Sequence, residues 1–427
     1  ITPSLDEMVD IASELERRKL NIPVMIGGAT TSRIHTAVKI DPQYSGAIVH
    51  VIDASKAVPA AGNLINKKSY ENYLSGIKSE YSRLRENHQK NRGAKKYIPL
   101  EQARKNKFKI DWQNYQPPVP FKTGIQEFKN FPLSEIRKYI DWNPFFITWE
   151  LKGKYPAIFE NPDYGAEAKT LFDDANKILD KIISEKLLSA DGVTGIFPAN
   201  TIGEDDIEIY FDENRKSSRA LIHTLRQQYE KSENNPSIAL ADFIAPKESG
   251  KNDYIGAFAV TAGNGIENLI RKYEKENDDY SSIMVKAVAD RLAEAFAELL
   301  HEKIRKEIWA YSKDENLAND DLIAEKYAGI RPAPGYPAQP DHTEKITLFN
   351  LLDAAKVTGI TLTENLAMNP AASVCGLYFS HPEAKYFTTG KISKDQVDDY
   401  RKRKGISINE AEKWLRPVLN YDESDKL

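Results

Sequence analysis

Apolar residues recur every three or four positions near the start of the chain. In SLDEMVDIASELERRKL, Met8, Ile11, Ala12 and Leu15 fall on one helical face, and Ser4 stands where an N-cap is expected. The apolar runs IPVMIGG and GAIVHVID predict two buried strands, and a second helix begins near ASKAVPAAGNLIN. Strand, helix and strand with short links favour a parallel sheet, which binds ligands at the carboxyl ends of its strands.

The pattern changes after a charged helix, YENYLSGIKSEYSRLRENHQK. The next residues are basic and poor in core positions, which predicts an interdomain linker centred on residues 91–96. Beyond it, long helices are interspersed with strands such as DDIEIYFD and YIGAFAVTAG. We therefore expect an α/β fragment of a doubly wound parallel sheet in residues 1–90. An α+β domain with a mainly antiparallel sheet and long helices should follow in residues 91–427.

The longest predicted helix covers residues 281–309 and carries an apolar stripe of 3.6-residue period. Asp290, Glu294 and Glu298 are spaced by four, so they lie near one face. Glu298 and His301 form a Glu-x-x-His pair, as in helical di-iron sites. Such sites need a second pair, which this sequence lacks, so no metal is expected.

Composition narrows the possible functions. A length of 427 residues suggests two to three domains, and the net charge of −4 gives no reason to expect nucleic acid or an anionic membrane as partner. No apolar run approaches the roughly 20 residues of a membrane span. The single cysteine, Cys375, excludes an internal disulfide and fits a cytoplasmic location. The absence of an initiator methionine and of a signal pattern suggests an internal fragment.

A proline-rich segment, GIRPAPGYPAQPDHTEK, predicts a stiff extended loop. Gly335 is free to adopt positive φ or to let a ligand approach the backbone. Arg331 suits a carboxylate or phosphate, which a guanidinium binds through two parallel hydrogen bonds. The alternative is a proline-rich structural connector.

Two further segments admit both a binding and a structural interpretation. IGGATTSRIHTAVK is either a glycine- and hydroxyl-lined ligand turn or a tight turn before a helix N-cap, and it is not a P-loop. DWNPFFITW is aromatic core, although a carboxylate beside aromatic rings also suits a cationic, purine-bearing ligand. No Gly-x-Ser-x-Gly elbow or other nucleophile signature occurs.

Taken in order, many segments resemble the C-terminal end of cobalamin-dependent methionine synthases. They include IPVMIGGATTSRIHTAVKI, YIDWNPFFITWELKGKYP, DDIEIY, DYIGAFAVTAG, IMVKAVADRLAEAFAELLHEKIRK, GIRPAPGYPA and ASVCGLYFSHPEAKYF. The resemblance implies the last part of a cobalamin-binding domain in residues 1–90, followed by an S-adenosylmethionine-binding reactivation domain.

The resemblance also implies site residues. Of the family's cobalamin motifs only the Gly-Gly pair is present, at Gly27 and Gly28, while Thr2 and Ala54 match contacts to the corrin or its nucleotide tail. The cobalt-ligating histidine is absent, and zinc belongs to an upstream domain. The S-adenosylmethionine site should comprise Asp141, Arg331, Ala333, Gly335, Tyr336, Tyr386 and Phe387, with Glu294 and Glu325 near the sulfonium.

By this resemblance the whole enzyme moves a methyl group from methyltetrahydrofolate through cobalamin to homocysteine. The present segment would restore methylcobalamin from inactive cob(II)alamin, with S-adenosylmethionine as methyl donor and an electron from flavodoxin or a similar reductase. Its partners would be that reductase and the upstream domains, and no side chain need act as catalyst. The alternatives are a binding module without turnover, or a free-standing methyltransferase. The sequence lacks the glycine-rich turn of the common methyltransferase fold.

Overall fold

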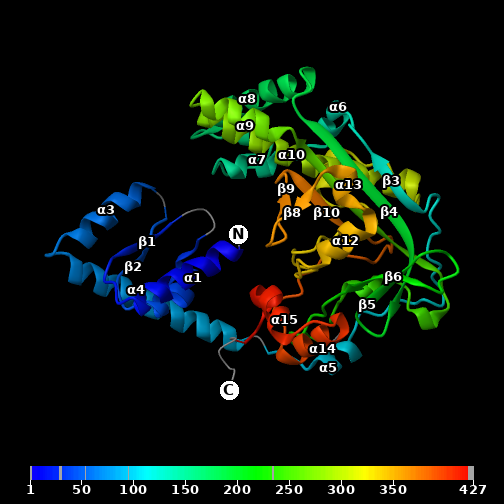
Figure 1. Cartoon of the computed structure of the whole chain (residues 1–427), viewed down its shortest axis with the longest axis horizontal. Coiled ribbons are helices and arrows are strands. Elements are labelled where there is room, and N and C mark those ends of the chain that lie inside the picture. Colours follow the sequence, from blue (N-terminus) through cyan, green and yellow to red (C-terminus); the bar gives the residue numbers. More distant parts are fainter. Residues whose placement is uncertain (1, 28–30, 53, 95, 233–234, 422–427) are drawn as a thin grey trace. The chain divides into compact units, whose positions relative to one another are not determined.

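The chain forms two compact units, Ile1–Tyr97 and Ile98–Leu427 (Figure 1). The computed structural model describes residues 2–27, 31–52, 54–94, 96–232 and 235–421. The sequence predicts a boundary after residue 90 and a linker centred on residues 91–96. Helix α4 (Tyr70–Ala94) instead continues through Gly93. A glycine inside a helix costs only about 1 kcal/mol relative to alanine, so it does not by itself end one.

The first unit is built on a parallel pair of strands, as the sequence predicts. β1 (Val24–Ile26) pairs in parallel with β2 (Ile48–His50). Its helical elements are α1 (Thr2–Arg17), α2 (Arg33–His35), η1 (Thr36–Ile40), η2 (Asp41–Gln43), α3 (Ala54–Ile65) and α4. Ile48 packs in one apolar cluster with Ala12 of α1, and Val49 packs in another with Leu64 of α3. Successive residues of β2 therefore bury opposite faces, which is typical of a parallel strand. Because α1 begins at Thr2, Ser4 lies inside the helix and is not its cap.

The second unit contains an antiparallel sheet. Its strands run in the order β10-β7-β4-β5-β6, and β3 also pairs with β4. The bounds are β3 (Gly124–Phe128), β4 (Ser189–Ile202), β5 (Asp206–Tyr210), β6 (Ser218–His223), β7 (Asp253–Asn264) and β10 (Ser373–Tyr378). The strands that the sequence predicts in DDIEIYFD and YIGAFAVTAG are confirmed as β5 and β7.

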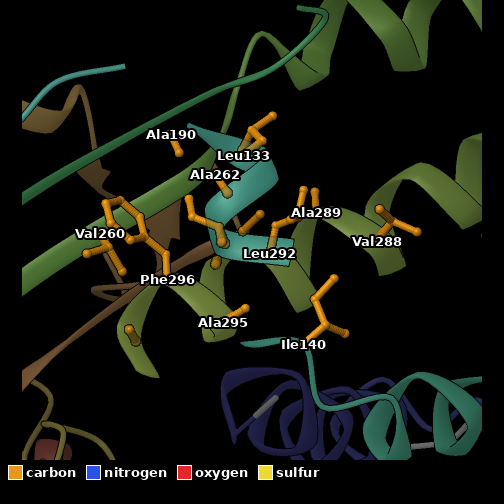
Figure 2. Packing of buried hydrophobic residues seen from close by; sticks show 14 of the residues in the cluster. Leu133, Ile140, Ala190, Val260, Ala262, Val288, Ala289, Leu292, Ala295 and Phe296 are labelled. Carbon is orange, nitrogen blue, oxygen red and sulfur yellow. The ribbon is translucent and has the colours of Figure 1, made fainter. Parts of the chain in front are cut away.

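Both faces of the sheet are covered by helices. Phe258 and Val260 of β7 belong to the core with α10 (Asp279–Lys303), whereas Ala257 and Ala259 belong to the core with α12 (Glu344–Leu352). Figure 2 shows Val260 of the sheet beside Phe296 of α10. α10 continues into the π-helical turn η7 (Ile304–Ile308), so the long helix predicted over 281–309 is confirmed, with a wider π-helical end.

The remaining helices flank these two layers. α6 (Leu133–Ile136), α7 (Asn143–Thr148), α8 (Gly165–Ser184) and α9 (Ile266–Lys275) contribute to the core on the α10 side, and α13 (Ala354–Thr358) contributes on the α12 side. The unit also contains four further helices, α5 (Leu100–Lys105), α11 (Asn319–Ile323), α14 (Lys394–Lys404) and α15 (Ile408–Leu415). It has five 3-10 turns in the described ranges, η3 (Arg137–Tyr139), η4 (Ala157–Glu160), η5 (Leu240–Phe243), η6 (Lys247–Ser249) and η8 (Arg416–Val418). A two-stranded ribbon is formed by β8 (Thr361–Leu362) and β9 (Met368–Asn369). Within the ranges given above, no helix is long and apolar enough to span a membrane.

Buried ion pairs connect α14 to Asp341 and to Glu344, the first residue of α12. Lys404 donates to Asp341 at 2.8 Å and to Glu344 at 2.5 Å, and both carboxylate side chains are only 1% exposed. Nearby, Arg226 is fully buried between Asp205 and Asp242. Because each charge has an opposite partner in hydrogen-bond contact, the desolvation penalty of burying it is offset.

Candidate functional site

A cavity of about 470 Å³ opens in the second unit beside α10, β7 and β10. It lies in the size range of about 300–1,000 Å³ that small-molecule sites occupy. The lining residues are Phe258, Glu294, Glu325, Arg331, Pro332, Ala333, Tyr336, Pro337, Ala338, Val374, Cys375, Tyr386, Phe387 and Thr388. Seven of the nine residues that the resemblance assigns to S-adenosylmethionine are therefore brought together in one place.

The proline-rich segment forms one wall of this cavity. Its ends are fixed by backbone hydrogen bonds, from Leu377 N–H to the Pro332 carbonyl at 2.8 Å and from Gly335 N–H to the Gln339 carbonyl at 2.7 Å. Gly335 has φ +89°, as the sequence predicts. A Cβ at this position would lie 2.3 Å from the His342 ring, so only glycine fits. Gly335 thus shapes the loop, although it is not itself a lining residue.

Arg331 is held by three side chains beneath the cavity. Its Nη2 donates to Glu298 Oε2 at 2.5 Å, and its Nη1 donates to the Tyr327 hydroxyl at 2.9 Å and to His301 Nδ1 at 3.1 Å. The side chain remains 22% exposed. The sequence predicts that this guanidinium binds a carboxylate or phosphate through two parallel hydrogen bonds. The structure shows that a buried carboxylate already neutralises it.

Acids and tyrosines surround the rest of the opening. Glu294, on α10, and Glu325, just after α11, are both exposed at the cavity. The Tyr386 hydroxyl accepts a hydrogen bond from Arg331 N–H at 3.0 Å, so it ties its own segment to the start of the proline-rich loop. Tyr336 is 62% exposed at the opening. The cavity thus presents two carboxylates, one compensated guanidinium and several apolar or aromatic surfaces.

Asp141 is not among the lining residues. Its Oδ1 instead accepts from Asn143 N–H at 2.9 Å and from Asn143 Nδ2 at 2.7 Å, so it bonds to the first residue of α7. The aromatic residues that follow it, Phe145 and Phe146, are buried core, as the structural interpretation of DWNPFFITW predicts. The sequence places the Asp141 carboxylate next to aromatic residues, but it does not show whether that side chain faces a ligand site or a neighbouring backbone group.

Several lining residues were missed at the sequence level. Phe258 comes from β7, and Val374 and Cys375 come from β10. No local sequence pattern distinguishes them, because a buried strand has the same apolar sequence whether its face packs against a helix or lines a cavity. Burial raises the pKa of the Cys375 thiol to about 12. It therefore stays protonated at neutral pH and is no nucleophile.

The residues that the resemblance assigns to cobalamin lie in the first unit. Gly27 directly follows β1 and is exposed at the carboxyl end of that strand. Thr2 and Ala54 are the first residues of α1 and α3, but their side chains lie outside the described parts, as does Gly28 altogether. Across the described ranges, no group of three or more His, Cys, Asp or Glu residues is placed to hold a metal ion.

Fold and cavity together define an α+β domain built around a small-molecule site. The family model of the vitamin B12-dependent methionine synthase activation domain matches residues 132–405, and the chain belongs to that family. A solved structure described as the MetH reactivation domain bound to AdoHcy is 56% identical, with a TM-score of 0.75. That match covers 76% of this chain and 99% of the other chain. The family membership that the sequence indicated is confirmed, and the matched residues 132–405 include the whole cavity.

Proposed function

We propose that the chain binds S-adenosylmethionine in this cavity and presents its methyl group for the reactivation of cobalamin. The observation that carries the proposal is the convergence of Arg331, Glu294, Glu325 and the stiff loop around one cavity of suitable size. The relative of known structure was solved with AdoHcy, which is S-adenosylmethionine without its transferable methyl group.

The charges at the cavity suit this ligand. S-adenosylmethionine carries a carboxylate, an ammonium and a sulfonium, so it needs one cationic and at least one anionic partner. Arg331 would bind the carboxylate, and the exposed carboxylates of Glu294 and Glu325 would face the cationic groups. Phe258, Val374 and the prolines offer apolar surface for the adenine ring. The chain's residues would bind and orient the donor, and an aligned donor gains a large effective molarity.

Proton transfer has no part in the proposed step. Transfer of a methyl group from a sulfonium to reduced cobalamin releases a neutral thioether, so no general acid or base is required. Cobalamin would supply the nucleophile when bound. Gly27, exposed after β1, fits close approach of a bulky group to the backbone; among the described residues, a Cβ there would meet the Val51 carbonyl at 3.4 Å. Cobalamin is proposed here as a cofactor of the full enzyme.

The wider setting is also proposed. The substrate chemistry of methyltetrahydrofolate and homocysteine would belong to upstream domains of the same enzyme, and flavodoxin or an equivalent reductase would supply the electron. A cytoplasmic location is consistent with the single, buried cysteine.

The alternative function is a module that binds S-adenosylmethionine without transferring its methyl group, and one experiment distinguishes it from a methyltransferase. Incubation with cob(II)alamin, a reductant and methyl-labelled S-adenosylmethionine forms labelled methylcobalamin only if the chain supports transfer.

Calorimetric titration with S-adenosylmethionine tests the binding site. Arg331→Ala should weaken binding by about 2–4 kcal/mol, the range for removing one partner of a buried charged pair. Arg271→Ala is a matched control, because Arg271 lies on α9, outside the cavity lining, and its side chain hydrogen-bonds to Glu267 and Asn268 of the same helix. Unchanged affinity in Arg331→Ala would refute the assignment of the cavity.

A further inference from the structure

The Glu298 and His301 pair of α10 has no role in the function proposed so far. Both side chains are buried, with exposures of 7% and 0%. They lie one helical turn apart on the same face, and both contact Arg331, at 2.5 Å and 3.1 Å. Tyr327 is the third member of the set, and its hydroxyl accepts from Arg331 at 2.9 Å.

Counting donors shows what these contacts leave free. A guanidinium has five N–H groups in one plane. Nη1 donates to Tyr327 and His301, and Nη2 donates once, to Glu298. Among the residues that the structure describes, none accepts from Nε or a second time from Nη2. The donors left are Nε–H and one N–H of Nη2, so the Nε–Nη2 edge is the one edge that can offer two parallel donors, the arrangement that a carboxylate binds.

The chemistry of His301 is consistent with this arrangement. Burial, followed by the nearby guanidiniums of Arg331 and Arg305, holds the pKa of His301 well below its usual range. The neutral ring accepts at Nδ1, as bonding to an arginine requires, because an arginine can only donate. The ring is further fixed by stacking on Tyr378, with centroids 5.1 Å apart. His301 is thus a rigid acceptor.

Tyr327 is fixed as firmly. Its ring lies beneath Arg305 and Arg331, at 4.4 Å and 5.6 Å from the ring centroid. Its hydroxyl lies 3.2 Å from the hydroxyl of Tyr386, which in turn accepts from the backbone of Arg331. The acceptors of Arg331 therefore have restricted positions of their own before any ligand arrives.

We propose that Glu298, His301 and Tyr327 are positioning residues that fix the guanidinium plane of Arg331 and direct its Nε–Nη2 edge to the carboxylate of the ligand. This inference rests on the proposed binding of S-adenosylmethionine. It explains the Glu-x-x-His spacing without a metal: the two side chains hold an arginine. Preorganisation of this kind improves affinity because the ligand does not have to order the group that binds it.

Two ligands that differ only in the carboxylate provide the test. S-adenosylmethionine has this group, and decarboxylated S-adenosylmethionine lacks it while keeping the sulfonium, amine and adenosine. In the full chain, Tyr327→Phe and His301→Ala should each weaken S-adenosylmethionine about tenfold, in keeping with loss of a hydrogen bond to a charged group. Affinity for the decarboxylated ligand should change by less than about twofold, since it does not use Arg331.

Two more variants make the comparison specific. His301→Asn places an amide oxygen near the Nδ1 position and should recover part of the loss seen in His301→Ala. Tyr311→Phe is the matched control: this partly buried tyrosine donates to the Ala328 carbonyl at 3.4 Å and, among the described residues, has no hydrogen bond to Arg331, so the variant should leave both affinities unchanged. Tyr327→Phe removes a single oxygen, so its result stands even if His301→Ala fails to fold.

The possible results distinguish failure of the positioning role from failure of the proposed S-adenosylmethionine binding. Equal weakening of both ligands, or unchanged S-adenosylmethionine affinity in Tyr327→Phe, would overturn the positioning role while leaving the binding site in place. A wild-type chain that binds neither ligand would instead overturn the proposed function. Selective loss of the carboxylate-bearing ligand supports both.

Discussion

Gly335 shows how one residue determines the shape of the cavity wall. Its positive φ and its closeness to the His342 ring exclude any side chain. The sequence predicts this freedom, because a glycine among prolines is the one position that can reverse the chain direction. What it could not predict is the identity of the opposing ring, since that contact depends on how the following turn folds back.

Gly335→Ala should weaken S-adenosylmethionine binding at least about tenfold, because the left-handed backbone costs an L-residue about 1–2 kcal/mol and the new methyl group meets His342. Adding His342→Ala should restore part of the affinity by removing the clash but not the strain. Gly250→Ala is the control: φ is +67° there and nothing lies within 4 Å of a new Cβ. Titration calorimetry on the three variants gives the comparison, and tight binding by Gly335→Ala would contradict this account of the loop.

His381 gives the molecule a pH-dependent stability. It packs against Tyr115 at 4.2 Å between ring centroids, and its Nδ1 accepts from Glu383 N–H at 3.1 Å. Burial lowers the pKa of His381 from 6.5 to about 4. Between these values the unfolded chain binds the proton and the folded chain does not, so stability falls as pH drops from 6.5 towards 4.

The full effect of His381 is about 3 kcal/mol, from 2.5 pH units at about 1.36 kcal/mol each. His381→Phe keeps an aromatic ring and removes the titration. Urea unfolding at pH 7 and pH 5 should therefore show a smaller acid-induced loss in the variant than in the wild type. Identical losses would show that other groups cause the acid sensitivity.

At the scale of elements, β4 is a strand that the sequence pattern does not predict. It contains Gly192, Gly195 and Pro198, residues that usually end strands. The structure explains two of these exceptions. β3 pairs with β4 up to Ile196 and β5 pairs from Ala199 onwards, so Pro198 lies where the neighbour changes. A Cβ on Gly192 would lie 3.0 Å from Phe296, so the glycine permits close packing of α10.

The sequence also does not predict which residue packs against the Glu298 and His301 face of α10. Helical spacing placed Glu298 and His301 on one face of α10, and the structure confirms it. It could not reveal that Arg331, about thirty residues later, would return to this face. Arg331 was singled out from the residues themselves, and the other lining residues named in advance came from family resemblance. Asp141, also carried over from the resemblance, accepts hydrogen bonds from Asn143 and does not line the cavity.

The attachment of α14 depends on Lys404. Lys404→Met should destabilise the second unit by about 3–5 kcal/mol, because it leaves the buried carboxylates of Asp341 and Glu344 without their cation. Lys402→Met, in the same helix, removes only an exposed pair with Asp398 and should change stability by about 0–1 kcal/mol. Denaturant unfolding of both variants measures the contrast. Equal effects would mean that the buried pairs contribute no more than surface pairs.

At the scale of the whole molecule, the cavity belongs entirely to the second unit. Lys96 is exposed and lies outside any helix or strand, just before the boundary after Tyr97. Limited trypsin should therefore cut near Lys96 first and release a fragment close to 98–427. This fragment should retain the S-adenosylmethionine affinity of the full chain. Early cleavage within the sheet, or a fragment without affinity, would contradict the independence of the unit.

The order of the cavity walls along the chain has a consequence for synthesis. β7 and α10 contribute first, and the last wall, residues 386–388, is translated long after them. A nascent chain that stops before β10 holds the long strands and α10 but has no closed pocket. Domains emerge N-terminal part first. Under the proposed function, the stabilisation that a bound ligand gives by mass action would therefore reach the protein only when translation is nearly finished. Prematurely terminated chains would face cellular proteases without that protection, however abundant the ligand.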